Sequence, residues 1–62
     1  MANSHHHERV TVSDIAQMTG YSTSAIYHWQ RAGKLPPVAP PRQLEWYRRD
    51  IEQWIDENFD FG

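Results

Sequence analysis

The residues best suited to direct chemistry lie in one short stretch, residues 20–33, with the sequence GYSTSAIYHWQRAG. A helix of about residues 23 to 32 would place Ile26 and Trp29 together on its inner face. The polar and aromatic residues left on the outer face are Ser22, Thr23, Ser24, Tyr27, His28 and Arg31. Their hydroxyl, imidazole and guanidinium groups donate hydrogen bonds to phosphate oxygens and base edges. The face therefore predicts DNA binding, with an ordinary polar surface or a protein contact as the alternative.

His28 adds a charge that depends on pH, because a histidine side chain titrates near neutrality and attracts phosphate when protonated. Tyr27 is open to two interpretations, a contact to base or phosphate and a lid over the hydrophobic core. Neither residue has an acidic neighbour on the outer face of this helix. The composition of the face is therefore unlike that of a solvated helix, which normally mixes both signs of charge.

Two further cations, Arg48 and Arg49, stand at the start of a predicted helix of about residues 48 to 58. A cation at a helix N-terminus interacts unfavourably with the helix dipole, so a partner is expected to retain it. Phosphate is the favoured partner for at least one of the two. The alternative is a surface ion pair with Glu45 or Glu52, which contributes little to stability.

Enzyme chemistry and metal binding find almost no support in the sequence. The chain has no cysteine, so a thiolate nucleophile and a cysteine-based zinc site are absent. A phosphate-binding glycine loop and a nucleophile with its base are also missing. The run His5, His6 and His7 has no fixed geometry for a metal and is typical of an expression tag. We therefore predict a protein that is not an enzyme and needs no cofactor or metal.

The charge is divided unevenly along the 62 residues. Although the net charge is −2, residues 1–49 carry a net charge of +3 and residues 50–62 carry −5. Such a dipolar molecule can meet phosphates with one face while its acidic end stays away. No apolar run is long enough for a membrane span or a signal peptide, so the protein is expected to be cytoplasmic and associated with the nucleoid.

The elements that position these residues follow from local signals. Thr11 and Asp14 form the pattern of a capping box, which predicts a helix over residues 12 to 19 that ends at Gly20. Ser22 is a good N-cap for the next helix, and Gly33 closes it. Only about three residues separate the two helices, so they should cross steeply as in a helix-turn-helix.

The remaining segments complete a mainly α domain. Four prolines between residues 34 and 46 exclude a helix there and predict a short, stiff two-stranded hairpin or a loop. Residues 1–10 are expected to form a flexible leader, residues 11–58 the domain, and residues 59–62 a tail. The predicted core contains Val12, Ile15, Ile26, Ile51 and the three tryptophans at positions 29, 46 and 54.

The runs VTVSDIAQMTGYSTSAIYHWQRAGKLPPV and LEWYRRDIEQWI together resemble small winged helix-turn-helix proteins of the phage excisionase and AlpA type, related to the MerR DNA-binding domain. The resemblance covers about residues 10 to 56. It implies three helices plus a short proline-rich wing, with residues 23 to 31 in the major groove. The wings of this family commonly carry glycines and several basic residues, whereas this wing has only Arg42 near its tip.

The resemblance also implies a function. An excisionase binds repeated sites on double-stranded DNA, bends the DNA and helps an integrase, while neighbouring copies of the protein assist one another. AlpA-like transcriptional regulation is the close alternative, and the IYHWQRAGKLP run is also similar to the N-terminal domain of a phage terminase small subunit. A protein-interaction adaptor is the rival from another class. The DNA-binding residues expected in total are Ser22, Thr23, Ser24, Tyr27, His28, Arg31, Lys34, Arg42, Arg48 and Arg49.

Overall fold

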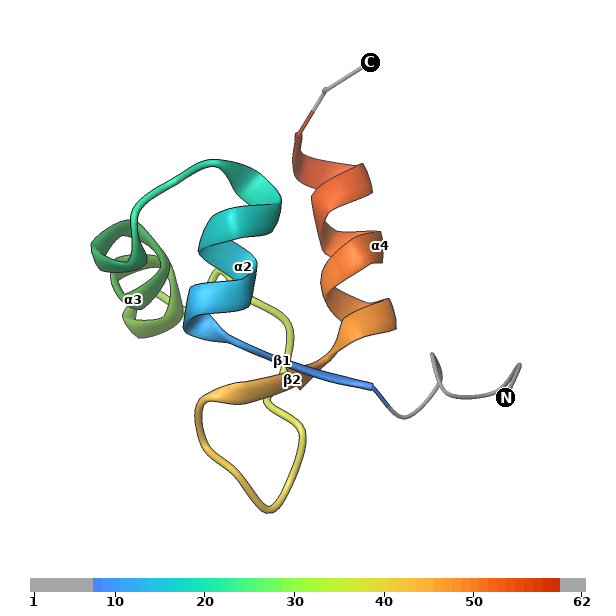
Figure 1. The fold of residues 1–62 in the computed structure, drawn as a ribbon. Coiled ribbons are helices and arrows are strands. Elements are labelled where there is room, and N and C mark those ends of the chain that lie inside the picture. Colours follow the sequence, from blue (N-terminus) through green and yellow to red (C-terminus); the bar gives the residue numbers. More distant parts are fainter. Residues whose placement is uncertain (1–7, 60–62) are drawn as a thin grey trace.

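The computed structural model describes residues 8–59 and contains three helices and one small sheet within that range. In chain order the elements are β1 (Arg9–Thr11), α2 (Val12–Thr19), α3 (Thr23–Arg31), β2 (Glu45–Tyr47) and α4 (Arg48–Asn58). Figure 1 shows the helices arranged around the crossing of the two strands, with α3 and α4 on opposite sides of α2. The mainly α fold with three helices that the sequence predicted is confirmed.

Helix α2 has the predicted bounds, and α3 begins at the predicted residue and ends one residue earlier than predicted. The Thr11 side chain accepts a hydrogen bond from the backbone N–H of Asp14, and the Asp14 carboxylate accepts one from the Thr11 backbone, so the capping box is complete. Gly20 has φ 81° and donates its N–H to the Ala16 carbonyl, which ends α2. The Ser22 side chain then accepts from Ala25 and starts α3.

The C-terminal end of α3 is closed by two hydrogen bonds around Gly33, which has φ 75°. The Gly33 N–H donates to the Gln30 carbonyl and the Lys34 N–H to the Trp29 carbonyl, which is the pattern of a Schellman motif. A side chain would be strained at this positive φ. In Figure 1, α3 is viewed nearly along its axis while α2 lies across the view, so the helices cross steeply as predicted.

The sheet corrects the expected bounds of the leader and decides between the hairpin and the loop expected for the proline-rich segment, in favour of the loop. Strand β1 pairs with β2 in antiparallel register, with Val10 opposite Trp46. Residues 9 and 10, which were assigned to a flexible leader, therefore belong to the fold, and Val10 is buried. The proline-rich segment also forms no hairpin of its own, because β2 takes the distant β1 as its partner. Proline has no N–H to donate to a strand ladder, which explains why the four prolines stay outside the sheet.

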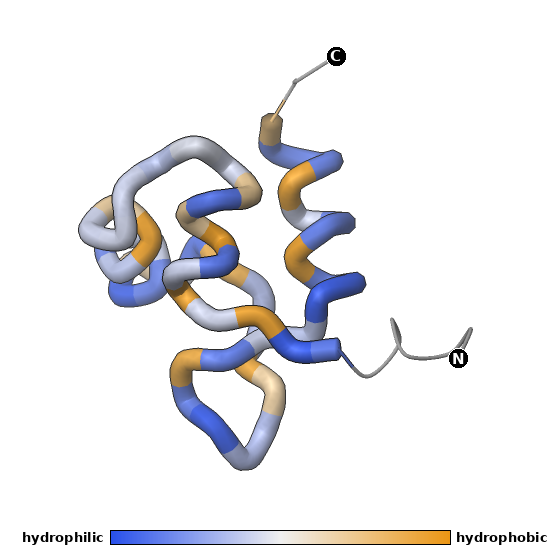
Figure 2. The backbone as a smooth tube through the Cα atoms, in the orientation of Figure 1, coloured by the Kyte–Doolittle hydropathy of each residue, from blue (hydrophilic) through white to orange (hydrophobic). Residues whose placement is uncertain are grey.

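A single core joins all five elements. Its buried members are Val10, Val12, Ile15, Ile26, Trp46 and Ile51. Figure 2 shows the hydrophobic positions on the inner sides of the helices and at the strand crossing. Trp46 is the largest fully buried side chain, whereas Trp29 and Trp54 are partly buried and pack against this core. The sequence-based core assignment is therefore confirmed, with a smaller degree of burial for two of the tryptophans.

The segment of residues 34–44, called the proline loop below, is fixed by side-chain donors from other elements. The Trp54 indole N–H donates to the Lys34 carbonyl, and the Trp46 indole N–H donates to the Pro36 carbonyl, both at 2.9 Å. Arg9 donates to the carbonyls of Ala39 at 2.8 Å and Pro40 at 2.6 Å. Proline has a carbonyl acceptor but no N–H donor, so the loop has more acceptors than donors. The side chains of Trp46, Trp54 and Arg9 supply donors for four of these carbonyls.

Four aromatic rings hold the end of α4 against the helix-turn-helix. Trp29 lies between Tyr21 and Trp54, with ring centroids 4.9 Å and 5.9 Å away. Phe59, directly after α4, lies within 6 Å of all three of these rings, at 5.7, 5.9 and 5.4 Å. Edge-to-face and tilted contacts of this kind favour packing beyond the area they bury. The cluster therefore ties α3 to α4 on the side opposite the strands.

Replacement of Trp46 by alanine should unfold most of the protein. Truncation of a buried tryptophan costs about 3 to 5 kcal/mol, which is comparable to the total stability expected of a domain of this size. The measurement is urea unfolding followed by circular dichroism. Tyr27→Ala is the matched control, because Tyr27 is 46% exposed and its loss should change the unfolding free energy by less than about 0.5 kcal/mol. Equal destabilisation in both variants would contradict the assigned core.

Replacement of Arg9 by glutamine should loosen the proline loop without unfolding the domain. The variant loses the forked guanidinium that reaches both Ala39 and Pro40. We expect faster hydrogen exchange at the Ala39 N–H, which bonds to the Glu45 carbonyl, by about tenfold, the equivalent of about 1.4 kcal/mol. Exchange within α2 should stay unchanged. Unaltered exchange at Ala39 would show that Arg9 does not hold the loop.

Candidate nucleic-acid interface

Helix α3 has one face in the core and one in solvent, and the division matches the residue types. Ile26 is fully buried, and Ala25, Trp29 and Gln30 are partly buried. The exposed residues follow helical spacing along a single stripe, which comprises Thr23, Ser24, Tyr27, His28 and Arg31. This α3 stripe contains every outward residue that the sequence placed within the helix. Tyr27 is an exposed member of the stripe and no lid over the core.

Ser22 lies at the beginning of the stripe and has a structural task as well. Its hydroxyl oxygen accepts the Ala25 N–H at 3.2 Å, while its own hydrogen remains available as a donor. The first turn of α3 carries no acidic residue. Because the N-terminus of a helix has a partial positive charge and unpaired N–H groups, this end of α3 is suited to a phosphate group.

Three cations in α3 and the proline loop make no ion pair with another residue in the range 8–59. Arg31 ends α3, Lys34 follows it, and Arg42 lies in the proline loop, and all three residues are exposed. Within residues 8–59, the ion pairs of arginine and lysine side chains involve Arg9, Arg48 and Arg49 alone. In addition, residues 15–44 contain no Asp or Glu. The helix-turn-helix and the proline loop therefore form a surface that attracts anions.

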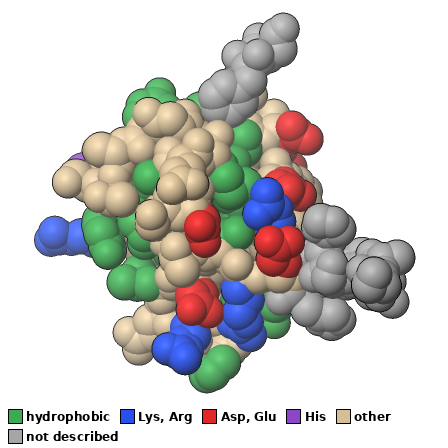
Figure 3. Space-filling view, in the orientation of Figure 1, with side chains coloured by type: hydrophobic (Ala, Val, Ile, Leu, Met, Phe, Trp, Pro, Cys, Tyr) green, Lys and Arg blue, Asp and Glu red, His purple; other side chains and the backbone are tan. Residues whose placement is uncertain are grey.

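The opposite side of the molecule is acidic. Figure 3 shows Lys and Arg side chains at the α3 edge, at the proline loop and also beside α4, whereas Asp and Glu side chains lie mostly over α4, with others near the middle of this face and beside the loop. Figure 1 places α3 and the tip of the loop on adjoining edges, both away from the C-terminal part of α4. A DNA duplex carries its charge along both strands, so this arrangement favours one orientation of the protein on DNA.

The proline loop takes the place of a wing. Its continuous exposed stretch comprises Pro40, Pro41, Arg42, Gln43 and Leu44. Leu44 is 42% exposed, so the loop also carries an apolar side chain in solvent, two residues after Arg42. A cation on a projecting loop is the kind of group that enters a narrow minor groove, where the negative potential is enhanced.

Arg48 and Arg49 differ from the other predicted site residues. Arg48 pairs with the Glu52 carboxylate at 3.0 Å and with Glu8 at 3.4 Å. The ion pair with Glu52 is one of the alternatives that the sequence left open. Arg49 has a side chain that is 67% exposed and lies 4.0 Å from an Asp50 oxygen, a weak contact. Arg49 is thus free to reach phosphate, whereas Arg48 would first have to exchange its carboxylates.

Arg9 is a contributor that sequence reasoning missed. It positions the proline loop through its two carbonyl contacts, lies 3.8 Å from the Glu45 carboxylate and stacks 5.2 Å from the Tyr47 ring centroid. The available signal was the alternation of Arg9, Val10 and Thr11, because β-branched residues favour strands. Residues 1–10 as a whole lack apolar periodicity, so three strand residues at their end give only a weak signal.

The histidine run, which the sequence analysis predicts to be part of an expression tag, lies outside the described residues. Within residues 8–59 there is no group of three or more His, Asp or Glu side chains that could hold a metal ion. In the same range no helix has the length and apolar character needed to cross a membrane.

Comparison with protein families agrees with this geometry. The family model of the helix-turn-helix domain matches residues 9–58, so the match begins at β1 and ends with α4. No curated protein and no solved structure gives a significant match to the chain. The matched range covers most of the 62 residues and includes the sheet that the sequence analysis left out. The chain therefore belongs to the helix-turn-helix domain family, whose members include excisionase and AlpA-type proteins.

Proposed function

We propose that this protein binds specific sequences in double-stranded DNA as a small winged helix-turn-helix protein. The observation that carries the proposal is the α3 stripe, which is exposed, continuous and without a carboxylate. In this proposal α3 enters the major groove with its N-terminal end toward the bases, as helix-turn-helix recognition helices do. Thr23, Ser24 and Tyr27 would contact bases or nearby phosphates, and His28 and Arg31 would extend the contact.

The loop and the remaining cations would place the protein on the duplex. Arg42 would reach the flanking backbone or minor groove, and Lys34 and Arg49 would contact phosphates. Such contacts fix the register of the protein and add affinity without reading the sequence. Arg48 is a weaker candidate for phosphate binding because two carboxylates already surround it.

The biological role that we propose is an excisionase, a factor that directs recombination by binding repeated sites and bending DNA beside an integrase. Transcriptional regulation of the AlpA type is the second form of the same proposal, and either activity would take place on DNA in the cytoplasm. One module of this size buries only about 600 to 1,000 Å² on DNA. Neighbouring copies on repeated sites would raise occupancy through a high effective concentration. No step in this role requires enzyme activity, a cofactor or a metal.

Footprinting across the protein's own genomic neighbourhood tests the proposal directly. Protected repeats beside an integrase gene would support an excisionase, and protection confined to a promoter would support a regulator. Binding only to the packaging region of a phage genome would favour the terminase alternative. An absence of any salt-sensitive protection would contradict DNA binding and favour a protein-interaction adaptor.

The affinity for DNA should fall steeply with salt. If Arg31, Lys34, Arg42 and Arg49 each neutralise a phosphate, log affinity against log salt should have a slope of about −3.6, since each contact releases condensed counterions. Fluorescence anisotropy of a footprinted duplex at several salt concentrations gives this slope. A slope close to zero would exclude the proposed surface.

Replacement of Arg31 by alanine should lower the affinity for the footprinted duplex by about 1 to 3 kcal/mol if its guanidinium reads a guanine. Arg31→Lys separates two roles, because lysine keeps a phosphate contact but loses the forked geometry. Binding is measured by anisotropy, and thermal unfolding verifies the fold. Asp56→Asn on α4 is the control and should bind DNA like the unmodified chain. If Arg31→Ala also retained full affinity, α3 would not be the reading helix.

A further inference from the structure

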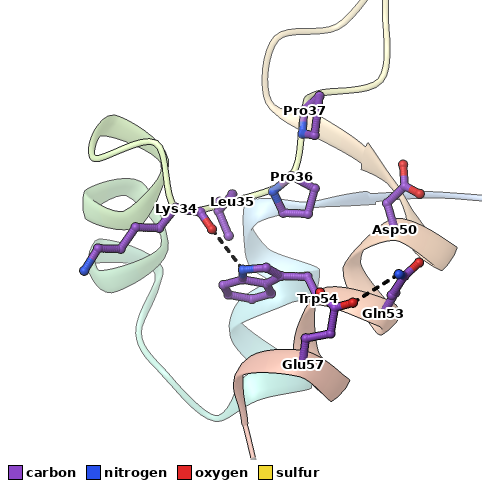
Figure 4. A pocket seen from close by; sticks show the side chains of 8 residues that line it. All are labelled: Lys34, Leu35, Pro36, Pro37, Asp50, Gln53, Trp54 and Glu57. Carbon is purple, nitrogen blue, oxygen red and sulfur yellow. Dashed lines mark hydrogen bonds between the residues drawn. The ribbon is translucent and has the colours of Figure 1, made fainter.

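A groove with a volume of about 390 Å³ lies between α4 and the start of the proline loop, apart from the α3 stripe. Pro36 and Pro37 form one wall, and the opposite wall comes from α4 (Figure 4). From α4, the indole of Trp54 and the carboxylates of Asp50 and Glu57 give this wall its aromatic surface and its negative charge. The groove thus combines apolar walls with negative charge.

The Trp54 ring is held in one orientation before any ligand arrives. Its N–H donates to the Lys34 carbonyl at 2.9 Å, and the ring contacts Trp29 and Phe59 at centroid distances of 5.9 and 5.4 Å. An aromatic surface that is already ordered loses little conformational entropy when it binds. The groove therefore offers a fixed, flat, electron-rich surface.

The carboxylates are placed by the periodicity of α4. Asp50, Trp54 and Glu57 follow a spacing of four and three residues, which puts them on one face of the helix. The Asp50 side chain is 40% exposed, and Glu57 is exposed and accepts a hydrogen bond from the Gln53 amide at 3.2 Å. Lys34 also lines the groove, but Figure 4 shows its side chain directed away from Asp50 and Glu57.

We propose that this groove binds an arginine side chain from a basic, extended segment of a partner protein. A guanidinium ion is planar, so it stacks on an indole ring while its N–H groups pair with carboxylates. The flanking part of the segment would pack on Pro36 and Pro37. Charge complementarity excludes nucleic acid as the occupant, because the carboxylates repel phosphate.

The cations that make no ion pair within residues 8–59, Arg31, Lys34 and Arg42, belong to the surface proposed for DNA, so a different protein is the expected source of the arginine. The two surfaces share Lys34, whose side chain points away from Asp50 and Glu57, and no residue of the α3 stripe lines the groove. A DNA-bound protein could therefore hold a partner at the same time.

The test is a titration of the full, ¹⁵N-labelled chain with a blocked hexapeptide of sequence PPRPRP, followed by NMR. We expect shifts of the Trp54 indole N–H and of backbone amides at Leu35 and in residues 50–57, with α3 unaffected. The peptide PPKPKP should bind about threefold or more weakly, because lysine cannot make the forked, stacked contact. No shift at millimolar peptide, or shifts confined to α3, would overturn the proposal.

Charge variants make the test specific. The double variant Asp50→Asn with Glu57→Gln should bind PPRPRP about tenfold more weakly, because both charge-assisted hydrogen bonds are lost. Asp56→Asn removes one negative charge from another face of α4, as many as the single variant Glu57→Gln, and should bind within about twofold of the unmodified chain. Asp50 lies in the first turn of α4, where a carboxylate stabilises the helix, so the double variant could be less stable. The single variant Glu57→Gln leaves Asp50 in place and provides a second measurement, and thermal melting verifies its fold. Equal affinity in all variants would contradict the site.

A second copy of the chain is the rival occupant. Arg42 lies beside two prolines in the proline loop and has the right chemistry. If the groove resonances shift with protein concentration in the absence of peptide, and Arg42→Ala abolishes that shift, the groove is an interface between copies and the proposal of a different partner protein is wrong. Spectra that do not change with protein concentration, together with binding of PPRPRP, support the proposal.

Discussion

The proline loop depends on donors that it cannot supply itself. Four of its residues are proline, so the segment has fewer N–H donors than carbonyl acceptors. The protein meets this need with long-range side-chain donors, the indoles of Trp46 and Trp54 and the guanidinium of Arg9. Because these donors come from β1, β2 and α4, the loop can take its place only when those three elements are assembled. Two of these bonds, from Arg9 to Ala39 and from Trp46 to Pro36, are partly buried, so water pairs those carbonyls less readily when the donors are absent.

The side-chain donors that hold the proline loop also fix the direction in which the chain leaves α3. The Schellman motif at Gly33 turns the backbone, and Trp54 then holds the carbonyl of the next residue, Lys34. Two residues further on, Trp46 holds Pro36. The C-terminal end of α3 is thus fixed by backbone and side-chain hydrogen bonds, while Ser22 fixes its beginning. A recognition helix that is restrained at both ends presents its exposed stripe with little conformational freedom, which favours specific binding.

The helices could be predicted because their signals are local. The capping box at Thr11, the N-cap at Ser22 and the glycines at positions 20 and 33 each act within a few residues, and α2 and α4 have the predicted bounds. The sheet could not be predicted in the same way, since it pairs Val10 with Trp46 across 36 positions of the chain. Each strand has three residues, too few for a clear alternating pattern. The same distance in sequence hid the role of Arg9 and the pairing of Arg48 with Glu8.

The separation of charge in the fold explains how so small a domain can carry two different surfaces. Residues 15–44 contain no acidic side chain, and they include α3 and the whole proline loop. Helix α4 contributes four carboxylates, at Asp50, Glu52, Asp56 and Glu57, of which Glu52 neutralises Arg48. Over distances longer than about 8 to 10 Å, salt screens charges on opposite sides from one another. The α3 stripe and the cations of the proline loop can therefore attract phosphate although the net charge of the whole chain is negative. Net charge alone is a poor guide to the binding partner of a domain whose two sides differ in charge.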